Sequence, residues 1–126
     1  MISHIDHLVL TTRELDKCVY FYTEILGMEL QSFSDGRKAL TFGNQKINIH
    51  EYGHEIEPKA HLPVPGSLDI CLISDKSISE VKDILQKHSV DIEIGPVKRT
   101  GAQGDIESVY VRDLDLNLIE ISNYLL

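Results

Sequence analysis

One order of secondary-structure signals occurs twice in this chain, and the repeat limits what the chain can fold into. Each half carries a strand pattern, an amphipathic helix pattern and then three further strand patterns. The strands of the first half are expected at 5–11, 28–33, 38–42 and 46–52, and its helix between 15 and 26. Those of the second half are expected at 68–73, 90–94, 106–111 and 116–122, and its helix between 78 and 85. Two successive βαβββ modules are therefore predicted.

This order favours an α+β fold, in which tandem βαβββ modules form a curved, cup-shaped mixed sheet with helices on the outer face. Short strands and a single helix in each half exclude a doubly wound parallel sheet. The length of 126 residues suits one domain. We place module one at about 4–52, a linker with three prolines at about 53–66, and module two at about 67–124.

Local signals mark the ends of several elements. Thr11 and Glu14 have the spacing of a capping box, and Ser77 and Glu80 repeat that spacing before the second helix. We therefore expect both helices to begin with a reciprocal cap. The Gly95–Pro96 pair is expected to end the strand at 90–94.

Charge and composition narrow the class of partner. Twelve Lys and Arg residues face twenty Asp and Glu residues, which gives a formal net charge of -8. Such a chain lacks the basic surface that nucleic acids and anionic membranes require. The N-terminus has no signal-peptide pattern, no apolar run approaches the ~20 residues of a membrane span, and Cys18 and Cys71 are expected to be buried thiols. These features predict a cytoplasmic protein that binds a small-molecule substrate, with no nucleic acid and no membrane partner.

A carboxylate in the middle of the last predicted strand is the most informative single residue. Glu120 lies between Ile119 and Ile121, and burying a charge there is unfavourable unless it is paired or bound to a cation. The other nitrogen and oxygen donors that strand alternation places in the same concavity are His7, Asp69, His50 and Asn48. Together these side chains form a plausible site for a divalent metal ion.

The same residues also have structural interpretations. A strand histidine such as His7 is more often a core or rim residue than a ligand. Lys46, Asn48 and His50 alternate along one strand and could form its solvated face. Asp69 could be structural, bonded to nearby backbone groups. From spacing alone, these alternatives stay open beside the metal site.

Several motifs along the chain carry a family resemblance. The opening reads Ile5-Asp6-His7-Leu8-Val9-Leu10, followed by Phe21-Tyr22 and Ile25-Leu26-Gly27-Met28, and the close reads Arg112-Asp113 and Asn117-Leu118-Ile119-Glu120. In this combination they resemble the vicinal oxygen chelate superfamily, which includes glyoxalase I, extradiol dioxygenases and fosfomycin-resistance transferases. Motifs between them, such as Gly36-Arg37-Lys38-Ala39-Leu40 and Glu57-Pro58-Lys59-Ala60, are similar to those of glyoxalase domain-containing protein 5 and its bacterial relatives.

The resemblance implies a metal-chelating cup with ligands from both modules. It places the family's first-strand ligand at His7 and its last-strand ligand at Glu120. The fifth-strand ligand, usually histidine, falls on Asp69. The fourth-strand position, often Glu in glyoxalase I, falls on Asn48, with His50 next along that face. The implied cofactor is a divalent metal ion (Mn, Ni, Zn or Mg), and an oxygen ligand at Asp69 favours harder ions such as Mn or Mg.

The last turn departs from the family pattern. Where the family usually has Asp-Pro-Asp-Gly, this chain has Asp113-Leu114-Asp115-Leu116. Because leucine does not readily adopt the left-handed conformation that glycine supplies, we expect the turn to differ in shape and to affect the placement of Glu120.

The function that the resemblance implies is a glyoxalase-type, metal-dependent lyase or isomerase, similar to lactoylglutathione lyase, for a small oxygen-chelating substrate. Glu120 or His50 would move a proton next to the polarised carbonyl. The residues expected to bind substrate are Asn48, Lys46 and Arg99, and the loop from Thr100 to Gly104 is expected to close over it.

A different class of function stays open. Binding proteins of the bleomycin-resistance type belong to the same superfamily and need no metal. The aspartate at position 69, where histidine is usual, favours this alternative. For either function the resemblance implies a homodimer.

Overall fold

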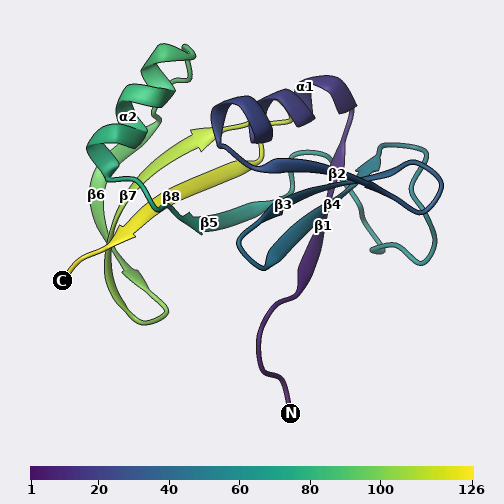
Figure 1. The fold of residues 1–126 in the computed structure, drawn as a ribbon, viewed down its shortest axis with the longest axis horizontal. Helices are drawn as coiled ribbons and strands as arrows, with labels where there is room; N and C mark the ends of the chain where they lie inside the picture. Colours follow the sequence, from purple (N-terminus) through teal and green to yellow (C-terminus); the bar gives the residue numbers. More distant parts are fainter. The chain divides into compact units, whose positions relative to one another are not determined.

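The computed structural model describes all residues, 1–126, and divides into two compact units, Met1–Ser67 and Leu68–Leu126 (Figure 1). The elements of the first unit are β1 (His7–Thr12), α1 (Leu15–Tyr20), the π-helical turn η1 (Phe21–Ile25), β2 (Glu29–Phe33), β3 (Arg37–Phe42) and β4 (Gln45–Glu51). Those of the second are β5 (Asp69–Ile73), α2 (Ile78–Lys87), β6 (Ile94–Gly101), β7 (Gly104–Arg112) and β8 (Leu118–Tyr124).

The first unit is a four-stranded mixed sheet with strand order β1-β4-β3-β2. Strand β1 runs parallel to β4, and the other neighbours are antiparallel. One face of the sheet is apolar and buried because alternate strand residues point to it. Its core consists of Leu10, Leu40 and Ile47 from the strands with Cys18, Phe21 and Tyr22 from α1 and η1.

The second unit repeats this arrangement with strand order β5-β8-β7-β6. Strands β5 and β8 are parallel, and the other pairs are antiparallel. Helix α2 packs on β7 and β8. Its core consists of Ile78, Val81 and Leu85 from the helix with Val109, Val111, Ile119 and Ile121 from the sheet. The predicted α+β class, with one helical segment and one four-stranded mixed sheet in each βαβββ module, is confirmed.

The two predicted capping boxes have different outcomes. At α2 the box is present: the Ser77 hydroxyl accepts from the Glu80 amide, and the Glu80 carboxylate accepts from the Ser77 amide. At α1 the prediction is wrong, because Thr11 still belongs to the ladder of β1 opposite His50. The helix begins at Leu15 without a side-chain cap.

The predicted strand at 90–94 is wrong, because β6 begins at Ile94 and continues through Gly95–Pro96. The pairing of β6 with β7 shifts register between Ile94 and Val97, and this bulge accommodates the proline. Gly95 has φ +113, and a Cβ there would lie 2.4 Å from the carbonyl oxygen of Ser108. Close approach of two strands, which no local pattern records, explains the glycine.

The predicted flexible loop from Thr100 to Gly104 is also corrected. Thr100 pairs with Asp105, and Gly101 pairs with Gly104. These residues close the hairpin of β6 and β7, so the segment is the paired end of a hairpin; its closure over a substrate stays a prediction.

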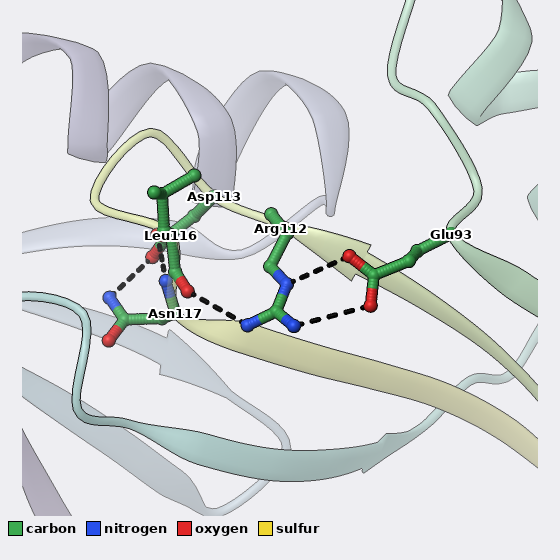
Figure 2. A network of polar contacts seen from close by, with 5 residues as sticks. All are labelled: Glu93, Arg112, Asp113, Leu116 and Asn117. Carbon is green, nitrogen blue, oxygen red and sulfur yellow. Dashed lines mark hydrogen bonds and ion pairs between the residues drawn. The ribbon is translucent and has the colours of Figure 1, made fainter.

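The turn between β7 and β8 contradicts the expectation that leucine would alter its shape. Leu116 adopts the left-handed conformation, with φ +70. Its amide donates to the carbonyl of Asp113 (3.0 Å), and its carbonyl accepts from Arg112 (3.2 Å) (Figure 2). The buried carboxylate of Asp113 accepts from the amides of Asp115 and Asn117 and from the side chain of Asn117. These bonds hold a backbone conformation that costs leucine roughly 1–2 kcal/mol.

Replacing Leu116 with glycine is therefore expected to stabilise the chain by about 0.5–1 kcal/mol, because relief of the left-handed strain outweighs the flexibility gained in the unfolded state. Little packing is lost, since Leu116 is 65% exposed. Urea denaturation followed by circular dichroism measures the change. Leu114→Gly is the matched control, because Leu114 lies in the same turn without a positive φ, and it is expected to destabilise. A loss of stability in Leu116→Gly would contradict the strain argument.

Candidate functional site

Four of the predicted site residues share one face of the first sheet: His7, Lys46, Asn48 and His50. In the parallel ladder of β1 and β4, His7 lies opposite Lys46, and Thr11 lies opposite His50. Residues two apart on a strand point to the same side, so these four side chains lie on the face opposite the apolar core. Asn48 and His50 are nearly buried, with 6% and 5% of their surface exposed, whereas His7 is exposed.

His7 is oriented by its neighbour in the sequence. Its Nδ1 lies 2.7 Å from Oδ2 of Asp6. An ionised carboxylate can only accept, so Nδ1 carries a proton, and Nε2 is the ring nitrogen left for a metal ion. The hydrogen bond to His7 is the main reason that the pKa of Asp6 lies below its ordinary value. A carboxylate on one ring nitrogen and a free second nitrogen is the usual state of a metal-binding histidine.

Asn48 has an unsatisfied side chain. Its Oδ1 is buried and accepts no hydrogen bond from the protein. A buried polar atom without a partner costs about 1–3 kcal/mol, so an external donor or a cation would restore the lost interaction. The alternative interpretation, in which Asn48 lies on a solvated strand face, does not explain why its side chain is buried.

His50 has the features of an uncharged imidazole that can accept a proton. Burial lowers the pKa of His50, and the nearby positive charge of Arg37 lowers it further, while Glu55 acts in the opposite direction. The imidazole is therefore neutral near pH 7. His50 lines a small pocket together with Arg37, His54 and Leu15.

The ammonium group of Lys46 packs against an aromatic ring. Its Nζ lies 4.2 Å from the centroid of the Phe33 ring, and the guanidinium carbon of Arg37 lies 4.9 Å from the same centroid. Both cations gain from the negative face of the ring. Lys46 is thereby held along the sheet surface.

The second sheet carries the other predicted residues on one polar face. The pairing of its strands places on that face Asp69, Cys71, Arg99, Ser108, Tyr110, Arg112, Glu120 and Ser122. Helix α2 covers the opposite, apolar face. Glu120 is half-buried, and Oε2 of Glu120 accepts from the hydroxyl of Ser108 at 2.6 Å. Its other oxygen, Oε1, makes no hydrogen bond within the chain.

The neighbour of Glu120 on β5 is Cys71, and Asp69 lies one step along the same face. Asp69 is exposed and pairs with Leu118 in the ladder. The pKa of Arg112 is raised mainly by its hydrogen bonds with Glu93, and the charge of Asp69 contributes. The structural interpretation of Asp69 is therefore supported by a cationic neighbour.

Cys71 is exposed, which corrects the expectation of a buried thiol, whereas Cys18 is buried as predicted. Burial of its sulfur and the charge of Glu120 still raise the pKa of the Cys71 thiol, against the effect of the bond with Ser122. The sulfur lies 3.3 Å from Oγ of Ser122. Cys71 was expected only as a buried thiol, and Ser108 and Ser122 were not predicted as site residues, although alternation within 106–111 and 116–122 places both serines on the face of Glu120.

Arg99 lies against Tyr110. Its Nε donates to the phenolic oxygen at 3.1 Å, and its guanidinium carbon is 5.5 Å from the ring centroid. Another of its nitrogens donates to the carbonyl of Lys98. The side chain is thus oriented on the polar face of the second sheet.

The predicted metal-binding residues are divided between the units: His7 and His50 belong to the first, Asp69 and Glu120 to the second. Neither unit by itself brings together three or more His, Cys, Asp or Glu side chains that could hold a metal ion. No helix has the length and hydropathy needed to span a membrane.

Two βαβββ modules, each with a polar face of histidine, carboxylate or amide donors, define a protein of the glyoxalase fold class. The chain belongs to the Glyoxalase/Bleomycin resistance protein/Dioxygenase superfamily, whose family model matches residues 4–121.

Two curated relatives are similar over almost the whole chain. The glyoxalase domain-containing protein RDO1 of Mycosarcoma maydis is 53% identical over 98% of this chain and 69% of that protein. Virulence protein STM3117 of Salmonella typhimurium is 49% identical over 98% of this chain and 86% of its own. The crystal structure of STM3117 has a TM-score of 0.97 and covers 99% of both chains.

More distant solved structures share the fold alone. Lactoylglutathione lyase from Agrobacterium tumefaciens is 22% identical, covers 97% of this chain and 94% of its own, and has a TM-score of 0.73. TnmS3, an antibiotic binding protein from Streptomyces, is 19% identical, covers 98% of both chains and has a TM-score of 0.78. An enzyme and a binding protein thus have the same architecture, so the fold does not select the activity.

Proposed function

We propose that this chain is a metal-dependent lyase or isomerase of the glyoxalase type, acting on a small substrate that presents adjacent oxygens. The observation that carries the proposal is the state of His7: Nδ1 is tied to Asp6, and Nε2 is free to bind a metal ion. The name of RDO1, a glyoxalase domain-containing protein, supports placing the chain in that branch of the superfamily.

The donor set fits a divalent cation. Nε2 of His7, Oε1 of Glu120 and the unpartnered Oδ1 of Asn48 combine imidazole, carboxylate and amide oxygen, which suit Mn, Ni, Zn or Mg. We propose His7 and Glu120 as metal ligands, with Asp69 and His50 as further candidates. When bound, the ion would polarise the adjacent oxygens of the substrate.

The remaining proposed roles follow from ionisation and position. His50, neutral because burial lowers its pKa, can accept a proton from the carbon next to the substrate carbonyl. Glu120 is the alternative base. Arg99 and Lys46 would attract an anionic group of the substrate, and Asn48 would bind a polar one.

A metal-free binding protein is the second candidate function. The observation that favours it is Asp69, an exposed carboxylate near Arg112 at the position where the family usually has a histidine ligand. TnmS3 is described as an antibiotic binding protein, and it has this fold.

Metal titration and an assay with a hemithioacetal substrate test the proposal. Metal-free protein is titrated calorimetrically with Mn²⁺, Ni²⁺, Zn²⁺ and Mg²⁺, and activity is measured before and after loading. We expect one ion per chain and activity only in the loaded protein. A preformed metal site would fill under these conditions. Uptake below about a tenth of an equivalent of every ion would therefore favour the metal-free binding protein. Light scattering on the same sample tests the proposed homodimer.

A further inference from the structure

Four side chains on the polar face of the second sheet form a continuous row of hydrogen bonds. The sulfur of Cys71 lies 3.3 Å from Oγ of Ser122, and that oxygen lies 2.7 Å from Oγ of Ser108. Oγ of Ser108 lies 2.6 Å from Oε2 of Glu120. The row crosses three neighbouring strands, β5, β8 and β7, and both serines are fully buried.

Counting hydrogens gives this row a direction. A carboxylate only accepts, so the single hydroxyl hydrogen of Ser108 points to Glu120. Ser108 must then accept from Ser122, because it has no second hydrogen. Ser122 has in turn used its only hydrogen and must accept from the thiol of Cys71. Each of the three hydrogens then has one acceptor, so the row is satisfied from thiol to carboxylate.

We propose that Ser108 is a positioning residue that holds Oε2 of Glu120 and leaves Oε1 as the single carboxylate atom available to a bound ligand. Ser122 donates to Ser108 and fills its acceptor side, whereas the bond to Glu120 is made by the Ser108 hydroxyl alone. The identity of that ligand as a divalent cation rests on the proposed function; the orientation of Glu120 does not. The same device operates at His7, where Asp6 occupies one ring nitrogen and leaves the other free.

Ser108→Ala and Ser122→Ala form a matched pair of variants. The two serines are direct partners across β7 and β8, both are buried, and each variant deletes one hydroxyl. Only Ser108→Ala removes the bond to Glu120. We expect the calorimetric affinity for Mn²⁺ to fall about 10–100-fold in Ser108→Ala, the range found when a group that orients a metal ligand is lost. In Ser122→Ala we expect a change below about threefold, since Ser108 can still donate. Equal losses, or none, would overturn the proposal.

Crystal structures of the wild type and both variants provide a readout that needs no metal. We expect the carboxylate of Glu120 to leave its position in Ser108→Ala and to keep it in Ser122→Ala. An unmoved Glu120 in Ser108→Ala overturns the proposal. If the wild type takes up no metal, the proposed function fails, and the position of Glu120 still decides this inference. Ser108→Cys replaces the hydroxyl with a weaker and slightly larger donor, and this variant enters both measurements if the alanine variant does not fold.

Discussion

Replacing Glu120 with glutamine is expected to abolish uptake of the divalent ion and to lower kcat/KM in the hemithioacetal assay by at least about 100-fold. Glutamine has the same shape and can still accept from Ser108, so the sheet is preserved. The change removes the negative charge of the proposed metal ligand. Calorimetry measures the ion affinity, steady-state kinetics measure the rate, and circular dichroism checks the fold.

Glu107→Gln is the matched control for this variant. Glu107 lies on β7 beside Ser108 and points to the opposite face, where it pairs with Lys98 and Asn123 in the ladder. It loses the same charge from the same sheet, and we expect its affinity and rate to stay within about twofold of the wild type. Wild-type ion uptake and activity in Glu120→Gln would remove Glu120 from the mechanism.

Replacing Asp113 with alanine is expected to lower the free energy of unfolding by about 3 kcal/mol. The Asp113 carboxylate is 3% exposed and accepts hydrogen bonds from the amides of Asp115 and Asn117 and from Nδ2 of Asn117. Alanine leaves these buried donors without partners (Figure 2). Asn117, which is 1% exposed, also accepts from the amide of Leu68. Urea denaturation measures the loss, and the melting temperature should fall by about 10 °C.

Asp113→Asn separates the contributions of the two carboxylate oxygens. Its carbonyl can still accept the backbone amides, while its NH₂ group faces the amide of Asn117 and cannot accept from it. We expect about half of the loss seen in Asp113→Ala. A change below about 0.5 kcal/mol in the alanine variant would show that the turn does not depend on this carboxylate.

Alternation along the strands could be predicted because it is a local property of an extended chain. Apolar residues at Ile119 and Ile121 turn Glu120 to the other face, and the ladder of β5 and β8 shows this arrangement. The same reasoning placed Asp69 on that face. The cap at Ser77 was predictable for the same reason, since the cap and its partner are three residues apart.

Elements that depend on distant partners were predicted less well. The start of β6 is set by its bulged pairing with β7 and by the close approach of Gly95 to Ser108. Leu116 violates its own backbone preference because Asp113 and Arg112 hold the turn around it. At Gly95 the deciding contact comes from another strand. At Leu116 it comes from residues three and four positions earlier, and the distant partner is Glu93, which holds Arg112.

The sequence by itself determined the repeat, the α+β class and the chemical types of the candidate residues His7 and Glu120. Periodicity, and a charged residue between apolar ones, can both be recognised within a short stretch of sequence. Only the structure showed which of their atoms are free, through a contact between adjacent residues at His7 and a contact between strands at Glu120. Nε2 of His7 is available because Asp6 holds the other nitrogen. Oε1 of Glu120 is available because Ser108, from a different strand, holds Oε2. A hydrogen bond between strands depends on their register, and register is settled only when the whole sheet is assembled.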